Sequence, residues 1–578
     1  MKNIRNSIKY FTLLGVLCSV LVGINSCSSR ENDVPSKEEI NGTVLRVNIA
    51  GIAENIEVDA SPMASKSNTI AGVSSESSMT ITEKMLNLNG FDALVSTEKV
   101  NYSNSGLANT AVASSSKLGT TALGLMDIGT KYRLMIYNAA DTNHTTPVVN
   151  IEATSGTDPV IKIDAGKSYT WYAFSLNETG AVPSVSNGIV AKAGLKNKNI
   201  FYANGTLNAQ YGENYLNIIF NHNTARINLA IDSRGMFGTM GSNPLKNLNV
   251  GASALLLKYG DLNVFTGTYS NLSAYPATDV TPVNSYTNSV GSAVKEYTLY
   301  TVDNTAVPAN GLKAEIVRTE IIKKDPFGGA DIKVPMPDGT TIGFNNTAFT
   351  LTYNTAYKLN IRLIESGVKV GGVTWARSNL AWQADGTVQT KIFDPNPSRA
   401  YRVTTNNQSY YFYWGINPVG DYCADVYPAG AWRMPTTTEL RNTFIGRSSY
   451  RTVLRYATAG STLATADGLA GLEYDLDAGS VINTAYPALA QKLFFPMAGH
   501  SYGAVYQNHG FLIKDTDGRI DNLQINIWAV QNPRNYEALK WTSVYNEDGN
   551  KNLSLKTVAQ YTEPTNQYQA NIRCVRTK

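Results

Sequence analysis

Residues 215–231 read Tyr215-Leu-Asn-Ile-Ile-Phe-Asn-His-Asn-Thr-Ala-Arg-Ile-Asn-Leu-Ala-Ile231, with apolar residues at every second position on both sides of a polar centre. Side chains alternate between the two faces of a β-strand, so this spacing predicts two strands. Their apolar faces comprise Leu216, Ile218 and Phe220, then Ala225, Ile227, Leu229 and Ile231. The polar residues 221–224 between them predict a hairpin in which the two apolar faces share a core.

The same period of two recurs on either side of this stretch, whereas amphipathic helices are scarce before residue 365. The clearest further segments are Gly42–Ala50, Lys131–Tyr137, Ile161–Asp164, Tyr169–Ser175 and Tyr357–Ile364. Stretches rich in Ser, Thr, Asn and Gly, notably 61–79 and 101–120, predict long surface loops. The chain is therefore expected to be mainly β.

Composition agrees with strands joined by polar turns and excludes some function classes. Charged residues make up 16% of the chain, against about 25% in typical soluble domains, and there are 33 Tyr and 46 Gly. The formal net charge of +4 includes Lys2, Arg5 and Lys9 of the N-terminus, and without residues 1–26 it falls to 4 − 3 = +1, which gives no electrostatic footprint for nucleic acid. The four histidines (144, 222, 500 and 509) lack metal-ligand spacing, and no nucleophile-elbow, phosphate-loop or dinucleotide motif occurs, so we expect no enzyme, catalytic residue or metal centre.

The N-terminus has the pattern of a bacterial lipoprotein signal. A basic start is followed by an apolar run that is too short to span a bilayer and ends at Ser26-Cys27. This predicts a signal peptide over 1–26, lipidation of Cys27, and a polar tether over 27–42. The alternative is an ordinary secretory signal with an incidental cysteine. Either way the protein works outside the cytoplasm, and lipidation predicts an outer-membrane lipoprotein at the cell surface.

The amino-acid composition changes near residue 368, after which tryptophans become frequent. Pro435 followed by Thr436 and Glu439 predicts a helix start with a capping box. Cys423 and Cys574 can pair in an exported protein, and a bridge between them would cross-link the start and end of this segment. Two buried free thiols are the alternative.

Several passages between 42 and 365 resemble the fimbrillin family of Bacteroidales, the lipoprotein precursors of donor-strand pili. They are Asn41–Ile49, Gly129–Asn138, Asp164–Asn177 and Ile218–Leu229. The resemblance implies two tandem transthyretin-like β-sandwich domains, over 43–205 and 206–367. It also implies that a protease cuts near the first strand and that the open groove accepts a strand from another subunit. Arg46 is the candidate arginine, although it lies within the strand and can equally be a solvent-facing strand residue; Lys66 is the alternative cleavage site.

The segment 368–578 contains the passages Val373–Leu380, Ala431–Leu440, Phe495–Gly499, Trp541–Ser543 and Ile572–Arg576. In these passages it resembles the Fibrobacter succinogenes major paralogous domain, which is related to C-type lectins and to formylglycine-generating enzymes. The resemblance implies an α+β C-type-lectin-like fold. The motif positions are Trp375, Asn379, Trp432, Arg433, Pro435, Thr436, Glu439 and Trp541. We interpret these residues as structural rather than ligand-binding, since a large apolar face and a capping box explain them.

Together these features predict a fimbrial accessory or tip subunit that acts as an adhesin, with other fimbrillin subunits and a host, bacterial or matrix glycan or protein as partners. The main alternative is a monomeric surface lipoprotein that binds glycan, and an oxidase-like enzyme is a third possibility. No cofactor is expected. Two acidic turns, Asp515–Asp521 and Asn546–Gly549, could hold calcium, but Asp-Gly is first a hairpin turn.

Overall fold

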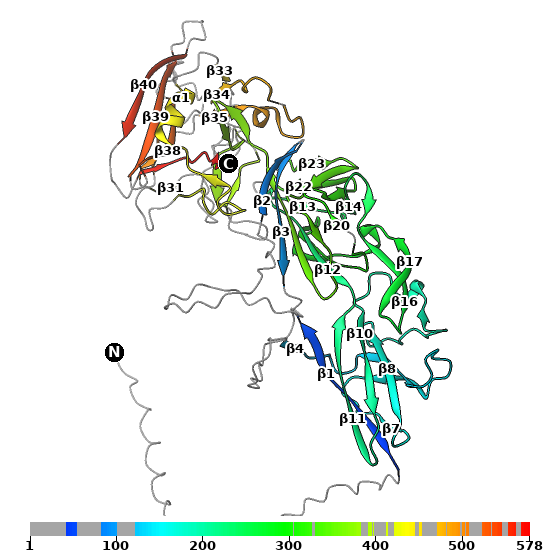
Figure 1. The fold of residues 1–578 in the computed structure, drawn as a ribbon. Coiled ribbons are helices and arrows are strands. Elements are labelled where there is room, and N and C mark those ends of the chain that lie inside the picture. The colour runs from blue at the N-terminus through cyan, green and yellow to red at the C-terminus, as the bar shows by residue number, and fades with distance from the viewer. Residues whose placement is uncertain are drawn as a thin grey trace, which may run out of the picture.

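The protein is mainly β, as predicted, and Figure 1 shows its sheets following one another along an elongated molecule. The computed structural model describes residues 42–54, 82–88, 90–100, 122–304, 306–325, 330–382, 391–395, 397, 412–413, 421–444, 450–453, 471–480, 482–496, 500–502, 505–507, 523–532, 535–545, 553–561 and 568–577. Within these ranges there is one α-helix, α1 (Thr437–Phe444).

The first sheet has eight strands and contains the start of the described chain. Its order is β4-β1-β11-β10-β8-β5-β6, and β7 also pairs with β1. The strands are β1 (Val44–Glu54), β4 (Ala122–Gly124), β5 (Lys131–Asn138), β6 (Val149–Thr154), β7 (Val160–Lys162), β8 (Ser168–Ser175), β10 (Phe201–Asn208) and β11 (Glu213–His222). Alternation works here as the sequence predicts, because Leu216, Ile218 and Phe220 of β11 pack in one core with Leu45 and Val47 of β1.

The second sheet has nine strands and begins with two strands that lie far upstream in the sequence. Its order is β2-β3-β26-β12-β19-β13-β22-β23, with β18 also paired to β19. The strands are β2 (Thr82–Asn87), β3 (Phe91–Val100), β12 (Ala225–Gly235), β13 (Thr239–Met240), β18 (Val283–Thr287), β19 (Ser292–Thr301), β22 (Thr319–Lys323), β23 (Ile332–Met336) and β26 (Ala356–Glu365). The chain therefore passes from the first sheet to the second after β1, returns at β4, and crosses again after β11.

The hairpin predicted across residues 221–224 is wrong, although both of its strands exist. β11 pairs with β1 and β10, whereas β12 pairs with β19 and β26 in the other sheet. Residues 223–224 thus link two sheets rather than turn within one. Period-two alternation fixes which face of a strand is apolar but not which partner covers it, so two different cores satisfied the same pattern.

Smaller sheets pack against the two large ones. They comprise β14 (Leu245–Val250), β15 (Ala254–Leu255), β21 (Leu312–Ile316) and β24 (Thr340–Gly343); β9 (Ile189–Val190), β16 (Lys258–Asn263) and β17 (Thr268–Ala274); and β20 (Ala306–Val307) with β25 (Phe349–Thr350). The β14/β15/β21/β24 and β20/β25 sheets share the core of the second sheet, whereas the β9/β16/β17 sheet shares a core with β5 and β8 of the first sheet. Three 3₁₀ turns lie at Lys192–Gly194, Ala277–Asp279 and Ala488–Gln491. The boundary expected between residues 205 and 206 falls inside β10, and the first sheet extends to His222. The second sheet also contains the upstream strands β2 and β3.

The third region, residues 368–577, combines short sheets with α1. Its strands are β27 (Val368–Val370), β28 (Val373–Trp375), β29 (Leu380–Trp382), β30 (Lys391–Phe393), β31 (Phe412–Tyr413), β32 (Trp432–Arg433), β33 (Tyr450–Val453), β34 (Gly471–Tyr474), β35 (Leu493–Pro496), β36 (His500–Tyr502), β37 (Val505–Gln507), β38 (Leu523–Asn532), β39 (Asn535–Tyr545), β40 (Leu553–Tyr561), β41 (Tyr568–Ala570) and β42 (Val575–Arg576). β42 lies between β28 and β32, so residues near 575 pair with the strands that open the region.

Candidate functional site

Strand β1 fills a slot in the first sheet, with hydrogen-bonded neighbours on both sides. On one side it runs parallel to β11, from Val44 beside Glu213 to Ala53 beside Asn221. On the other side it is antiparallel to β7 at its start and to β4 at its end. We call the space between β11 and the β7/β4 pair the β1 slot. Among the described strands of the first sheet, β1 alone precedes the excursion of the chain to the second sheet.

The inner face of β1 is buried. Leu45, Val47 and Ile52 are fully inaccessible to solvent and belong to the core of the first sheet. Burial of each such side chain contributes about 1.5–3 kcal/mol, so the core requires a strand with apolar residues at these places. Removal of β1 would expose this core and leave β4 and β7 without their pairing strand in the sheet.

Arg46, the candidate cleavage arginine, lies on the outer face of this paired strand. Its Nη2 donates to Glu213 Oε1 on β11 at 3.0 Å, and both side chains are partly exposed. The hydrogen bond from Arg46 to Glu213 and the charge of that carboxylate raise the pKa of Arg46. Because the backbone at Arg46 pairs with β11 and with β7, a protease could reach this bond only after β1 has opened. Lys66 and Cys27 lie outside the described residues.

A bulge interrupts β1 two residues before Ile52. The register with β11 shifts between Ile49 and Gly51, so Ala50 is an extra residue. Gly51 has φ +149°, and a Cβ at this position would lie 2.8 Å from the carbonyl oxygen of Gly124 on β4. A side chain is therefore excluded here both by backbone conformation and by the close approach of β4.

The third region is docked on the second sheet through a buried ion pair. Arg576 of β42 donates from Nη2 to Asp92 Oδ2 of β3 at 2.6 Å and to the carbonyl oxygen of Glu365 at 2.8 Å. The guanidinium lies 3.9 Å from the centre of the Trp432 ring. Burial raises the pKa of Asp92 and lowers the pKa of Arg576, because each charge has left water.

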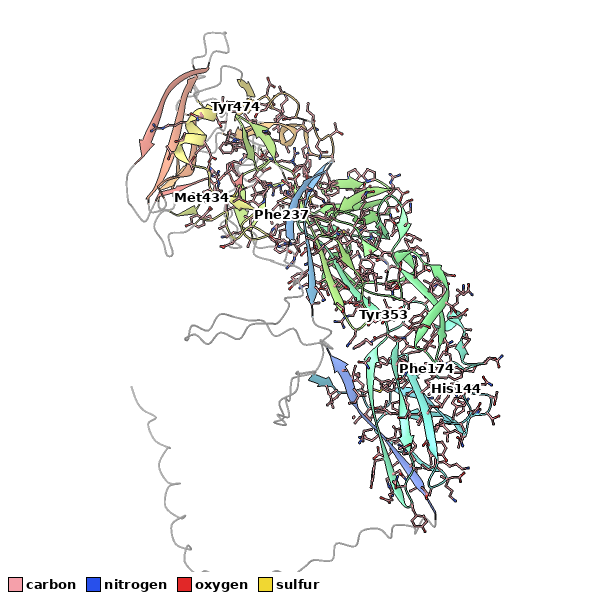
Figure 2. The ribbon with its side chains drawn as sticks, viewed as in Figure 1. His144, Phe174, Phe237, Tyr353, Met434 and Tyr474 are labelled. Carbon is pink, nitrogen blue, oxygen red and sulfur yellow. A yellow bond between two sulfur atoms is a disulfide. The ribbon has the colours of Figure 1, made fainter. Side chains whose placement is uncertain are left out.

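Two further contacts join the same surfaces. Arg234 of β12 forms a forked ion pair with Asp232 and lies between the rings of Tyr286 and Tyr427, whose hydroxyl donates to Asp232. Phe237 meets Phe393 of β30 edge to face at 5.1 Å, and Figure 2 shows Phe237 at the junction of the two regions. The third region is thus held by aromatic packing, by the hydrogen bond from Tyr427 to Asp232, and by the Asp92–Arg576 ion pair, which forms only in the docked arrangement.

The predicted capping box is confirmed at the start of α1. The backbone N–H of Glu439 donates to Thr436 Oγ1 at 3.2 Å, and the backbone N–H of Thr436 donates to Glu439 Oε2 at 2.7 Å, after Pro435. Arg433 adds two bonds to Glu439, at 2.8 and 2.5 Å. Burial opposes ionisation of Glu439, but the bonds from Arg433 and Thr436 outweigh it and lower the pKa of this carboxyl.

Trp375, Asn379 and Trp432 of the motif lie in the interior of the third region. Trp375 and Trp432 are at most 1% exposed, and Asn379 accepts a hydrogen bond at 2.8 Å from Arg573, which is wholly buried. Arg573 also donates to the carbonyl oxygens of Ala376 and Phe494, and burial lowers its pKa to about 9. No role is predicted for Arg573 or Arg576 from the sequence, where they belong only to the passage Ile572–Arg576. Their position on either side of Cys574 was the signal that could have identified them. Trp541 lies in β39, and its side chain is outside the described residues.

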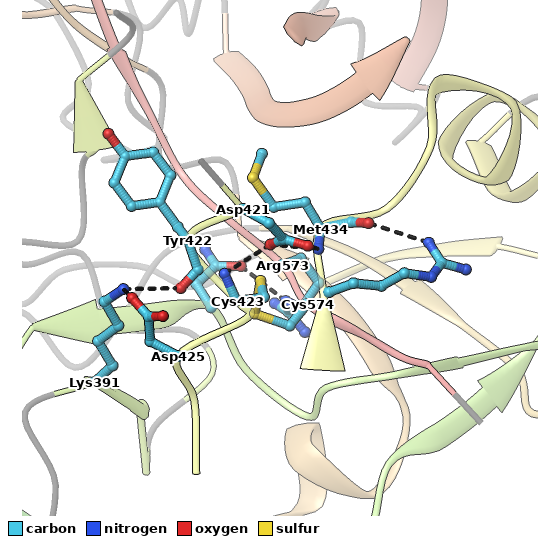
Figure 3. Close-up of a disulfide and its surroundings, with 10 residues drawn as sticks. Lys391, Asp421, Tyr422, Cys423, Asp425, Met434, Arg573 and Cys574 are labelled. Carbon is cyan, nitrogen blue, oxygen red and sulfur yellow. Dashed lines mark hydrogen bonds and ion pairs between the residues drawn. A yellow bond between two sulfur atoms is a disulfide. The ribbon is translucent and has the colours of Figure 1, made fainter. Parts of the chain in front are cut away.

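Cys423 and Cys574 form a disulfide, shown in Figure 3. Both sulfurs are buried in one apolar cluster with Trp432 and Met434. Beside them Asp421 accepts backbone hydrogen bonds from Cys423 and Met434, which fixes the loop that carries the first cysteine (Figure 3). The bridge therefore joins residues 421–434 to the segment that leads into β42.

The described residues show no group of three or more His, Cys, Asp or Glu side chains placed to hold a metal. The two acidic turns considered for calcium, 515–521 and 546–549, lie outside the described residues, as does His509. His222 is buried at the end of β11, where its Nδ1 lies 2.9 Å from Asn199 Oδ1. No helix in the described part of the chain is long and apolar enough to cross a membrane.

Comparisons with known proteins give weak likenesses. No family model and no curated protein matches the chain. A solved structure named as a cell adhesion protein, from Bacteroides fragilis NCTC 9343, is 13% identical over 46% of this chain and 92% of that chain, with a TM-score of 0.26. One of the same description from Bacteroides ovatus ATCC 8483 is 15% identical over 40% and 90%, with a TM-score of 0.22. A fimbrial assembly protein from Parabacteroides distasonis ATCC 8503 is 12% identical over 40% and 83%, with a TM-score of 0.20. At this level the likenesses decide neither fold nor function.

Proposed function

We propose that this protein is an accessory or tip subunit of a donor-strand fimbrium and acts there as an adhesin rather than as an enzyme. It would be exported as an outer-membrane lipoprotein through Cys27, lose its first strand, and accept a strand from another subunit. The observation that carries the proposal is the β1 slot. One buried strand, placed before all the others of its sheet in the sequence, completes a core that would otherwise be open.

The position of the cut follows from the pairing of β1. Cleavage at Arg46 would leave the second half of the strand in the slot, since pairing with β11 continues to Ala53. Cleavage between Glu54 and Thr82, where Lys66 lies, would free the whole strand and keep β2 and β3 attached to the second sheet. We therefore favour the segment 55–81, with Lys66 as the candidate residue.

The tip position is supported by the placement of residues 572–576. They include the disulfide-bonded Cys574 and the strand β42, which is paired on both sides. These residues are fixed inside the third region and cannot be given to a neighbouring subunit. The chain would accept a strand through its first sheet and present the third region, which we propose to be C-type-lectin-like, to a glycan or protein ligand.

A specific observation favours the alternative of a monomeric surface lipoprotein that binds glycan. β1 is fully paired, and Arg46 is tied to Glu213 in the uncut chain. The slot is therefore satisfied without any partner. If β1 stays in place, Cys27 is a permanent anchor and the third region acts at the membrane surface.

N-terminal sequencing of the protein recovered from cells separates the two functions. The fimbrial function predicts a first residue between 55 and 82 and labelling of filament ends by antibody to residues 372–578. A Lys66→Ala variant should keep lipidated Cys27 and lose filament labelling, whereas Arg46→Gln should still be processed. Retention of Cys27 in the wild-type chain, with antibody only at the membrane surface, would reject the fimbrial function.

A further inference from the structure

We infer that the β1 slot selects its incoming strand by two features, a glycine at the place of Gly51 and a basic residue at the place of Arg46, on a strand that runs parallel to β11. This inference rests on the proposed function, since it specifies the partner that the slot would accept. The partner is a strand of another subunit with the pattern apolar, basic, apolar, Asn, apolar, any residue, Gly, apolar. In β1 this pattern covers Leu45–Ile52.

The apolar positions follow from the core. Leu45, Val47 and Ile52 are wholly buried, and the bulge at Ala50 lets Ile52 face inward although it is five residues beyond Val47. A strand without the extra residue would turn its last apolar side chain to the outer face. Parallel direction is fixed by β11, whose partners rise from Val44 to Ala53 as its own numbers rise.

The glycine follows from the approach of β4. Any Cβ at the place of Gly51 would meet the Gly124 oxygen at 2.8 Å and the Leu123 Cβ at 3.1 Å. β4 pairs with β1 over three residues that start next to this point, so it cannot retreat without losing that pairing. With φ at +149°, the backbone conformation independently disfavours every residue except glycine.

The basic residue follows from Glu213. Its carboxylate accepts from Arg46 across the strands and from the hydroxyl of Tyr215 on its own strand. When β1 leaves, Glu213 stays on β11 at the rim of the slot. A strand that brings Lys or Arg to the same register restores the ion pair, and one that brings Asp or Glu faces a like charge. Asn48, which donates to Asn217 Oδ1 at 3.2 Å, is the next polar position.

The second sheet contains a permanent strand of the same design at the equivalent place. β26 runs parallel to β12 on one side and antiparallel to β3 on the other, as β1 does with β11 and with β7/β4. Its residues Tyr357–Ile361 repeat the pattern apolar, basic, apolar, Asn, Ile of Leu45–Ile49. At the place that aligns with Gly51 by sequence, however, β26 has Leu363, which faces the core of the second sheet because β26 has no extra residue after Ile361.

This comparison separates the two kinds of feature. The pattern of the first five residues belongs to the central position in either sheet, since both sheets use it. The glycine belongs to the β1 slot alone. A peptide with the β26 sequence should therefore enter the β1 slot poorly, and the single change of its Leu363→Gly should improve it.

The test uses the full chain with a specific protease sequence inserted between residues 55 and 81. After cleavage, a fluorescent peptide of residues 44–54 is allowed to replace the cut strand, and unlabelled peptides compete with it. We expect the Gly51→Ala peptide to compete at least about tenfold less well than the parent. The peptide of residues 356–365 should gain on Leu363→Gly. Equal competition by the parent and Gly51→Ala peptides would overturn the selection by glycine.

Charge is tested by exchange of signs. An Arg46→Glu peptide should compete about two- to fivefold less well with the wild-type slot, as befits a partly exposed ion pair, and should recover with a Glu213→Lys chain. Failure to recover would remove Glu213 as a selecting residue. The fimbrial function and the strand selectivity can be rejected separately. If the slot shows this selectivity but cells retain β1, the fimbrial function is wrong and the selectivity remains. If cells remove β1 but the slot binds all these peptides equally, only the selectivity is wrong.

Discussion

Strands β1 and β42 are both buried between two neighbours, yet they are held by different interactions. β1 is retained by apolar side chains and by one ion pair in which both side chains are more than a quarter exposed. β42 follows a disulfide and brings a buried arginine onto a buried aspartate of another sheet. Apolar contacts can be replaced by any strand of the right pattern, whereas a covalent bridge and a buried charge pair cannot. The comparison indicates one exchangeable strand and one permanent strand in the same molecule.

The disulfide should be the largest single contribution to this permanence. The bridge closes a loop with a sequence separation of 151 residues, and loop-closure entropy predicts a loss of about 5 kcal/mol when both cysteines are replaced. We expect a Cys423→Ala/Cys574→Ala chain to unfold its third region at lower denaturant. The first sheet should be unaffected, because it shares no core with that region. Limited proteolysis followed by mass spectrometry of the fragments reports both regions at once.

If the variant loses stability in both regions together, the first sheet does not fold independently of the third region. If the stability of the third region is unchanged, the disulfide does not stabilise it. A Cys423→Ser variant should behave in the same way, which separates a structural bridge from a catalytic thiol: a catalytic cysteine would lose an activity without loss of stability.

The buried pair between Asp92 and Arg576 should come next. Asp92→Leu leaves the guanidinium of Arg576 buried without its carboxylate, at a cost of about 3–5 kcal/mol. The double variant Asp92→Leu/Arg576→Met removes both charges and should recover most of that loss. Chemical denaturation of the wild-type chain, the Asp92→Leu and Arg576→Met single variants and the double variant gives the coupling energy directly. Lys131→Met, which breaks an exposed pair with Glu152, is the matched control and should cost less than about 1 kcal/mol.

If the double variant is as unstable as Asp92→Leu, the charge pair is not what docks the third region. The aromatic contacts of Phe237 and Tyr427 would then carry the junction.

The sequence predicted the strands well and their partners poorly. Alternation identified β1, β5, β8, β11, β12 and β26, and the Thr436/Glu439 box identified the start of α1. The same alternation wrongly predicted that β11 and β12 form one hairpin. A short polar link has the same sequence features whether it is a hairpin turn or a connection to another sheet. β3 was missed for a related reason: nothing local to it indicates that it joins β26, which lies more than 250 residues downstream, and β2 pairs only with β3.

The candidate site was predictable only in outline. Arg46 and the first strand were found from their pattern, but the role of Gly51 depends on the position of β4, which approaches from residues 122–124. Asp92 and Arg576 are 484 residues apart in sequence, so no local signal connects them. A pattern of local spacing cannot predict the role of a residue whose partner is distant in the sequence.

A fall in pH should destabilise the first sheet, which contains β1, but not the region that contains β42. The residue responsible is His222, at the end of the strand that pairs with β1. Burial, together with the positive charge of Arg226, lowers the pKa of His222 to about 3. In the unfolded chain a histidine has a pKa of about 6.5, so between these values the unfolded state binds the extra proton. Folding stability is therefore fully present above about pH 6.5 and is lost as pH falls toward 3, by up to about 1.4 kcal/mol for each pH unit.

From pH 7 to pH 5 we expect the first sheet to lose about 2 kcal/mol through this residue. The measurement is denaturant unfolding of the first sheet at pH 7, 6 and 5, read from the proteolytic fragments that contain β11. A His222→Gln chain starts from a lower stability, since the ring packs against Phe201 at 4.7 Å, but should lack this part of the pH slope. An unchanged slope in His222→Gln would assign the acid sensitivity to other groups. If the slope is removed, mild acid loosens the sheet around the exchangeable strand through a residue that the disulfide-held region does not share.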